Sequence, residues 1–320
     1  MPKNLPLKFG VLLPTREAVM TGRSDPSIIF QLAEKAEALG FDSVWVGDSL
    51  TARPRIEALT TLAAVGARTH RVRLGTAIFL AALRHPVLLA YQLASLDWLC
   101  GGRIDLGVGY GRPKEPAQEH EFEILGLSAG ARIKMTEELV QVMRRLWREN
   151  DVSHSGTFSR FEHVTLDPKP VQANGVPIWL ASNDVEPALR RVGRMGDGWI
   201  NNIKTPEVYG ECWQKIRCYA AEAKRNPETI VPGLYLTLAA GGKDAVVDGQ
   251  TFLAQYYNRS YEAVAKAMLC VTGSWDEVID RIEAFRQVGA NTIVLRFAAQ
   301  DQLRYLEDCA EALNRRALLA

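Results

Sequence analysis

Residues 103–116 read RIDLGVGYGRPKEP, an apolar run that leads into three glycines at alternate positions. A glycine-rich loop after a strand lets backbone amides approach a phosphate closely. The stretch therefore raises two questions: which anion the loop binds, and which fold presents it. The alternative, that the glycines only loosen the end of a strand, stays open at this point.

The dinucleotide-binding motif of Rossmann folds is the first candidate for this stretch. That motif requires glycine at positions one, three and six, followed by a helix whose amides face the pyrophosphate. Gly107 and Gly109 hold the first two positions, but Arg112 holds the sixth. Pro113 and Pro116 then disfavour helical backbone in the residues before them. We therefore predict a strand with no helix opening behind it, which excludes the Rossmann motif.

The same unit, a β-rich apolar run followed by a segment of helical period, repeats along most of the chain. Strands that are apolar on both faces, with helices between them, are typical of a parallel sheet. The predicted strands cover 7–13, 42–47, 72–79, 103–109, 177–182, 197–201, 229–240 and 291–297. The predicted helices between and after them include 54–68, 86–100, 132–149, 185–195, 205–225 and 300–315. Eight repeats predict an α/β fold, a (β/α)8 TIM barrel.

The eight repeats run through the chain without a Pro/Gly-rich linker, which a doubly wound sheet with a second domain would need. We expect a single domain over residues 1–320 with an insertion at about 241–271, after the seventh strand. A polar stretch at 151–175 predicts a short hairpin. A capping box, Ser274 to Glu277, opens the helix that follows the insertion.

Composition excludes several function classes. The formal net charge is +1 and no long run of one sign occurs, so neither nucleic acid nor a membrane surface is expected as a partner. No apolar run approaches the ~20 residues of a membrane span, and we expect a cytoplasmic protein. The five cysteines and five histidines form no CxxC or HExxH pattern, so no metal site is predicted. The segment 115–123, EPAQEHEFE, is interpreted as a solvated acidic loop.

Functional residues of TIM barrels lie at the C-terminal ends of the strands. This rule selects candidates before any family is considered. They are Pro14, Thr15, Asp48, Ser49, residues 77–80, 109–112 and 181–184, Asn201, Asn202, Arg296 and Phe297.

Several blocks of the chain, in order, carry a family resemblance. They are AEALGFDSVWVGDS (36–49), RVRLGTAIF (71–79), RHPVLLAYQLASLDWLCGGRIDLGVGYG (84–111), PKPVQANGVPIWLAS (168–182) and GRMGDGWI (193–200). With these blocks the chain resembles the luciferase-like flavin-dependent oxidoreductases, which include bacterial luciferase, flavin monooxygenases and F420-dependent dehydrogenases. The resemblance implies a barrel that holds a flavin or deazaflavin at the strand C-termini.

The resemblance also implies cofactor-binding residues. In such proteins a non-proline cis peptide at the end of strand three supports the isoalloxazine ring, and here that position is Ala77-Ile78. The phosphate or ribityl tail would be met by the loops after strands four and five, with Asn202 as a weaker candidate that also fits a helix cap. The implied tail-binding residues are Gly109, Tyr110, Gly111, Arg112, Ala181, Ser182 and Asn183.

The chain departs from the family just after strand two. Many members carry a histidine there beside an acidic residue, whereas VGDSLTARPR (46–55) has Ser49 preceded by Asp48. Asp48 fits either a buried structural acceptor or a group that orients substrate. Arg53 fits a site for an acidic substrate or cofactor tail, and equally a solvated loop arginine. These three residues are the catalytic candidates.

We weigh three functions. The first is a flavin-dependent monooxygenase that uses reduced FMN and O₂ on a small organic substrate, because this chemistry belongs to the cofactor and needs few acid–base residues. The alternative is an F420-dependent oxidoreductase that transfers hydride to or from the deazaflavin. The third is a non-catalytic flavin-binding relative. In each, the insertion would form a lid or substrate wall through its aromatic residues Phe252, Tyr256, Tyr257 and Tyr261.

Two partners follow from the resemblance. It implies a homodimer through helices near strands two and three, although barrel packing needs the apolar residues Leu59, Leu62 and Val65 of that region. A monooxygenase of this kind would also work with a separate flavin reductase.

Overall fold

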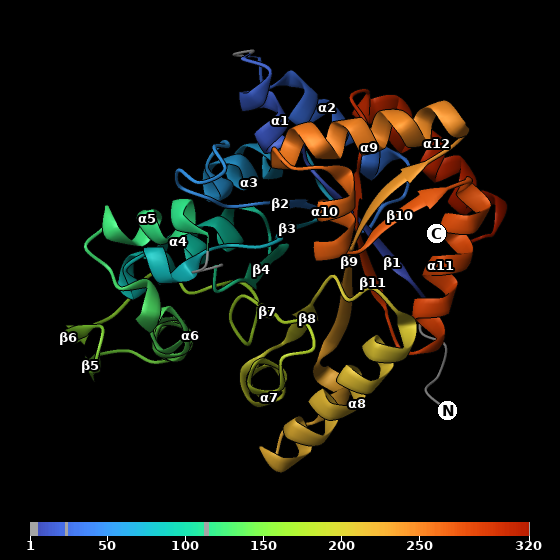
Figure 1. Cartoon of the computed structure of the whole chain (residues 1–320). Helices are drawn as coiled ribbons and strands as arrows, with labels where there is room; N and C mark the ends of the chain where they lie inside the picture. Colours follow the sequence, from blue (N-terminus) through green and yellow to red (C-terminus); the bar gives the residue numbers. More distant parts are fainter. Residues whose placement is uncertain (1–5, 23–24, 112–114, 320) are drawn as a thin grey trace.

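The computed structural model describes residues 6–22, 25–111 and 115–319. Its eight central strands are parallel and close into a barrel, because β8 pairs with β9 as well as with β7 (Figure 1). The barrel strands are β1 (Lys8–Leu12), β2 (Ser43–Val46), β3 (Arg73–Thr76), β4 (Ile104–Val108), β7 (Ile178–Ala181), β8 (Gly198–Ile200), β9 (Val231–Ala240) and β11 (Thr292–Phe297). The predicted TIM barrel is therefore confirmed.

Helices lie between consecutive barrel strands and after the last one, and they cover the outside of the sheet (Figure 1). They are α2 (Ser27–Ala38), α3 (Ala58–Gly66), α4 (Pro86–Leu99), α6 (Arg132–Arg148), α7 (Glu186–Met195), α8 (Pro206–Glu222), α11 (Trp275–Gln287) and α12 (Gln302–Arg315). The capping box predicted at Ser274 and Glu277 is present and opens α11. Apolar side chains from the strands and helices form one large buried cluster between the two layers.

A second, smaller cluster fills the inside of the barrel. Trp45 lies there almost fully buried, 5.4 Å from Trp179 in an edge-to-face arrangement, and its indole nitrogen donates to the Ser43 hydroxyl at 2.8 Å. Gly10 and Gly75 on the flanking strands leave the space that this ring occupies. A barrel of eight strands has an interior just wide enough for side chains, so these residues pack it solid.

Two local predictions are wrong. The helix expected over 54–68 begins only at Ala58, because Glu57 caps it by accepting a hydrogen bond from the Thr60 amide. The segment 115–123 is not a loop but helix α5 (Pro116–Glu123). Proline is tolerated at the first helical position, where its missing N–H costs nothing, so Pro116 starts this helix instead of preventing it.

The remaining elements lie around the barrel. Helix α1 (Thr15–Met20) follows β1, and strands β5 (Val152–Ser155) and β6 (Arg160–Val164) form the predicted antiparallel hairpin, which projects at one side of the molecule (Figure 1). The regular pairing of β3 ends at Thr76, three residues before the predicted end.

The predicted insertion holds two helices, α9 (Lys243–Tyr257) and α10 (Tyr261–Ala267), and the start of a ninth strand. That strand, β10 (Cys270–Gly273), pairs in parallel with the C-terminal half of β9. Phe252, Leu253 and Val264 join the two helices in a small core of their own, which also contacts Ala239 and Ala298 at the ends of two barrel strands. The insertion therefore sits at the C-terminal mouth of the barrel.

The space around Trp45 gives a prediction about stability. We expect Gly75→Ala to lower the free energy of unfolding by about 1–3 kcal/mol, because a Cβ at this position overlaps the Trp45 ring. Gly242→Ala is the matched control, since a Cβ there meets no atom within 4 Å. Urea unfolding followed by tryptophan fluorescence measures both. Equal midpoints for the two variants would show that the interior of the barrel adapts to the added methyl group.

Candidate functional site

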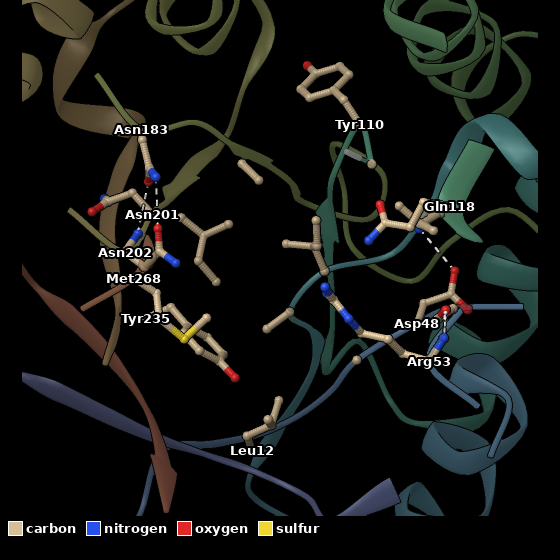
Figure 2. Close-up of a pocket in the computed structure, with 18 of the residues that line it drawn as sticks. Leu12, Asp48, Arg53, Tyr110, Gln118, Asn183, Asn201, Asn202, Tyr235 and Met268 are labelled. Atoms are coloured by element: carbon tan, nitrogen blue, oxygen red, sulfur yellow. Dashed lines mark hydrogen bonds between the residues drawn. The ribbon is translucent and has the colours of Figure 1, made fainter. Parts of the chain in front are cut away.

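A cavity of about 510 Å³ opens at the C-terminal mouth of the barrel. Its walls come from the segments after β2, β3, β4, β7 and β8 and from α9, as the strand-end rule predicts. Figure 2 shows Asn183, Asn201 and Asn202 on one side and Asp48 and Arg53 on the other. Cavities of this size hold small ligands and cofactors in other proteins.

The structure brings most of the predicted site residues together around this cavity. Gly109 lies behind the wall, against Ile78, and Arg112 lies outside the described residues. Those that line the cavity are Asp48, Ser49, Arg53, Ala77, Ile78, Tyr110, Gly111, Ala181, Ser182, Asn183 and Asn202.

The wall after β3 has the geometry that the resemblance implies. The peptide bond between Ala77 and Ile78 is cis, and the Ile78 carbonyl accepts a hydrogen bond from the Asp48 amide at 3.1 Å. A Cβ on Gly109 would overlap the Ile78 side chain, and a Cβ on Gly47 would overlap the Arg55 guanidinium. Glycine at these two positions therefore lets the wall and the arginine take their places beside the cavity.

The asparagine side of the cavity is fixed by its own hydrogen bonds. The Asn183 side-chain amide donates to the Asn202 side-chain oxygen at 2.8 Å, and the Asn202 backbone N–H donates to the Asn183 side-chain oxygen at 3.1 Å. The Ser182 hydroxyl donates to the Asn183 carbonyl at 2.8 Å. These reciprocal bonds hold two loops together, so polar groups face the cavity in one arrangement before any ligand binds.

Asp48 lies opposite, and its carboxylate is already engaged. Arg84 donates to its two oxygens at 2.6 and 2.9 Å, and the Leu80 amide donates to one of them at 3.0 Å. The Asp48 side chain is 3% exposed. A bidentate pair of this kind fixes the loop after β2 against the loop after β3, which favours the structural interpretation of Asp48.

Glu121 on α5 organises the rest of that loop, although nothing in the sequence marks it as a site residue. One of its carboxylate oxygens accepts from the Ser49 hydroxyl at 2.7 Å and from the amides of Thr51 and Ala52 at 2.7 and 2.9 Å. Ser49 in turn accepts from the Arg53 amide at 2.9 Å. The hydroxyl that stands where many relatives carry histidine is therefore part of a structural hydrogen-bond chain.

Arginine side chains gather on this side of the mouth. Arg53 pairs with Glu115 at 2.8 Å, and Arg55 lines the cavity and donates to the Arg53 carbonyl at 3.1 Å. Burial lowers the pKa of Arg16, and the neighbouring charges of Arg55 and Arg53 lower it further. Like charges this close repel one another, so the mouth favours anionic groups.

Tyrosine side chains form the third wall. Tyr235 from β9 and Tyr256 and Tyr257 from α9 all line the cavity. Figure 2 shows the Tyr235 hydroxyl pointing into the space between the asparagine and arginine sides. Burial raises the pKa of Tyr235 and of Tyr256, so both stay protonated at neutral pH. The predicted contribution of the insertion to the wall is thus made by two of its four named aromatic residues.

A family model described as "Luciferase-like monooxygenase" matches residues 7–292. The chain belongs to the luciferase-like monooxygenase family. Its members are oxidoreductases, which agrees with the resemblance seen in the sequence.

Three proteins are similar to this luciferase-like chain over most of its length. An F420-dependent glucose-6-phosphate dehydrogenase of Segniliparus rotundus is 28% identical over 95% of this chain and 96% of its own. One of the same name from Intrasporangium calvum is 30% identical over 85% and 89%. The solved structure of the monooxygenase RslO1 from Streptomyces bottropensis is 28% identical with a TM-score of 0.80, over 97% and 99% of the two chains.

Other residues of the cavity were also missed, for different reasons. Tyr235 is reachable from the strand alternation of 229–240, which places every second side chain inside the barrel. Gln118 comes from α5, where a loop was predicted, and Met268 lies inside the predicted insertion, for which only the aromatic residues were named. Across residues 6–22, 25–111 and 115–319, no helix has the length and apolar content to span a membrane.

The Asp48–Arg84 pair gives a second prediction. We expect Asp48→Asn to lower the free energy of unfolding by roughly 2–3 kcal/mol, because the largely buried Arg84 guanidinium loses its two close carboxylate contacts and is left with the exposed Glu57 carboxylate at 3.7 Å. Glu34→Gln, which breaks an exposed pair with Arg68, is the control and should cost less than about 1 kcal/mol. Urea unfolding measures both. An unchanged stability of Asp48→Asn would contradict the structural role.

Proposed function

We propose that this luciferase-like chain is an F420-dependent oxidoreductase acting on a small organic substrate. The observation that carries the proposal is the similarity, over nearly the full length of both chains, to a curated F420-dependent dehydrogenase. The sequence alone favours a monooxygenase with reduced FMN, but the alternative, coenzyme F420, fits these relatives better.

The residues around the cavity fit such a cofactor. Ala77 and Ile78 offer an apolar wall for the ring, and the glycines at 47 and 109 leave room for the Arg55 guanidinium and the Ile78 side chain beside the cavity. Tyr110, Gly111, Ser182 and Asn183 would hold the tail through amides and hydroxyls, and Arg53 and Arg55 suit its negative charge. When bound there, the deazaflavin supplies a carbon that gives or accepts hydride.

The protein's own groups favour the reductive direction. Oxidation of an alcohol needs a base for the hydroxyl proton, and the histidine that many relatives place after strand two is Ser49 here. The Ser49 hydroxyl donates a hydrogen bond to Glu121, so it is not placed as a free base. Leu12, Ile200 and Met268 give the cavity apolar surface that excludes water from the reacting atoms.

A flavin monooxygenase is the second candidate. It is favoured by the 28% identity to a solved monooxygenase whose fold superposes on this chain with a TM-score of 0.80. In that case a separate flavin reductase would supply reduced FMN. The two candidates differ in which cofactor binds, so a binding measurement separates them.

Cofactor binding tests the proposal directly. We expect oxidised F420 to bind with quenching of its fluorescence and at least about tenfold more tightly than FMN. Gly109→Ala should weaken F420 binding by about tenfold, because the added methyl group displaces Ile78 from the wall. Gly242→Ala serves as the control, and thermal unfolding confirms that both variants are folded. Tight FMN binding without F420 affinity would favour the monooxygenase; binding of neither would favour a non-catalytic relative.

We also propose that the chain is a homodimer and that α4 forms its interface. The face of α4 away from the barrel exposes Leu88, Tyr91, Trp98 and Leu99, with exposures of 47 to 74%. Contiguous exposed apolar side chains of this kind are typical of contact surfaces. Leu62 and Val65 of α3 are instead fully buried in the barrel core, so they are not available for a partner.

The dimer proposal predicts a change of mass in solution. We expect Leu99→Glu to convert the dimer to a monomer in light scattering after gel filtration, because a carboxylate would be buried in the interface. Val247→Glu, at an exposed apolar residue of α9, is the matched control and should leave the dimer intact. A monomeric wild-type protein would overturn the proposal.

A further inference from the structure

A buried arginine lies behind the tyrosine wall of the cavity. Arg296, near the C-terminal end of β11, is 2% exposed. One of its terminal nitrogens donates to the Tyr257 hydroxyl oxygen at 3.0 Å. Its guanidinium carbon lies 3.9 Å from the centre of the Tyr256 ring and 5.1 Å from that of Tyr257. The arginine is thus held by aromatic rings and one phenol.

Among the described residues, no carboxylate lies within ion-pair distance of this charge. Arg296 takes part in none of their ion pairs, and its Nε and second terminal nitrogen are buried without a hydrogen-bond partner among them. A guanidinium stays protonated under all ordinary conditions, and a buried cation is costly unless an anion or strong acceptor is near. The Tyr257 oxygen is the acceptor that the described structure offers it.

The hydrogen bond fixes the direction of the Tyr257 proton. A guanidinium donates and never accepts, so the phenol oxygen is the acceptor and its own O–H is directed elsewhere. Tyr257 lines the cavity and is partly exposed, whereas its neighbour Tyr256 is 5% exposed. Within the described residues no hydrogen bond uses the Tyr257 hydroxyl as donor. The Tyr257 O–H can therefore donate a hydrogen bond to a molecule bound in the cavity.

Charged and titratable groups reach Tyr257 from several elements. Besides Arg296 on β11, Arg53 of the loop after β2 lies 5.6 Å from its ring centre, and Tyr256 packs at 5.0 Å. Cys270 of β10 belongs to the same cluster. Glu17 of α1 adds one negative charge near Arg296 and Tyr256. The guanidinium groups of Arg296 and Arg53, which contact the Tyr257 ring, both carry a positive charge.

We propose that Tyr257 is the proton donor for reduction of a carbonyl substrate, with Arg296 as its positioning residue. This inference rests on the proposed F420-dependent function. The C=O π bond breaks as hydride from the reduced coenzyme forms the new C–H bond, and the Tyr257 proton forms the O–H bond. The substrate gains two electrons and the coenzyme loses two. The Tyr257 phenolate, held by Arg296, then regains a proton from solvent.

Two neighbouring hydroxyls are less suited to this role. The Ser49 proton is committed to Glu121, whose carboxylate also holds two backbone amides. Tyr235 also lines the cavity, but its pKa is raised by burial and no arginine hydrogen bond to its oxygen is present in the described structure. Tyr257 alone combines a cavity position with a hydrogen bond from a buried cation in that part of the chain.

Tyr257→Phe tests the proposal without depending on turnover. Carbonyl-labelled [¹³C]cyclohexanone is bound to the protein loaded with oxidised F420, and its carbonyl stretch is recorded by infrared difference spectroscopy. We expect the stretch to move to higher wavenumber in Tyr257→Phe, because one hydrogen bond to the oxygen is lost. Tyr261→Phe is the matched control: it removes a phenol of the same insertion that bonds to Thr272 and Gln250 outside the cavity lining. Its stretch should equal that of the wild type.

Single-turnover oxidation of reduced F420 by cyclohexanone gives the kinetic readout. We expect Tyr257→Phe to slow this step by about 10²–10⁴-fold and to lose the solvent deuterium isotope effect, with F420 affinity unchanged within about twofold. Tyr261→Phe should behave as wild type. Arg296→Lys, which keeps the charge, should retain more activity than Arg296→Met; since either change at a buried site can unfold the chain, Tyr257→Phe carries the test.

The outcomes separate this inference from the proposed function. A wild-type protein that does not bind F420 overturns both. F420 binding with equal carbonyl stretches in wild type and Tyr257→Phe overturns the role of Tyr257 and leaves the function standing. The same holds if Tyr257→Phe turns over cyclohexanone as fast as wild type. A wild-type protein that binds F420 but neither shifts the carbonyl stretch nor reduces cyclohexanone also overturns it.

Discussion

The packing of Trp45 inside the barrel is the constraint on which the site depends. Its ring lies against Trp179 and occupies space that Gly10 and Gly75 leave open, so the interior is solid at this level. Protein interiors are close-packed and transmit displacement instead of absorbing it. The strand ends above the ring are therefore fixed relative to one another. The cavity lies directly above this packed layer, so the residues of its walls are held in fixed relative positions.

At the mouth of the barrel, above this packed layer, buried polar contacts hold the loops in place. Asp48 with Arg84 and Glu121 with the loop of Ser49 connect three loops that the strands alone leave independent. The two asparagines do the same on the far side. Each contact satisfies groups that burial would otherwise penalise, so the loops have one stable arrangement without a ligand. The mouth is thereby organised for a rigid planar cofactor.

The sequence predicted the barrel and most of the cavity lining because both follow from local patterns. Strand periodicity, the Ser274 capping box and the strand-end rule each use residues close together in the chain. The Glu121 contact was missed because 115–123 is polar and proline-led, and only its packing on the loop after β2 makes it a buried helix. The contact between Arg296 and Tyr257 joins residues 39 positions apart, which no local pattern encodes.

The chemistry of the site depends on which side chains at the mouth carry charge. The position after β2 that is often a histidine is Ser49 here, and its hydroxyl donates a hydrogen bond to the Glu121 carboxylate. The polar groups on that side of the cavity therefore hold a loop in place. At the tyrosine wall, a buried guanidinium contacts Tyr256 and Tyr257 of the insertion. Segments that connect the elements of a scaffold vary more in sequence than the elements themselves. When the acid–base residue lies in an insertion and not at a strand end, it can change without altering many contacts in the barrel core. One barrel can then keep the same cofactor site and act on different substrates.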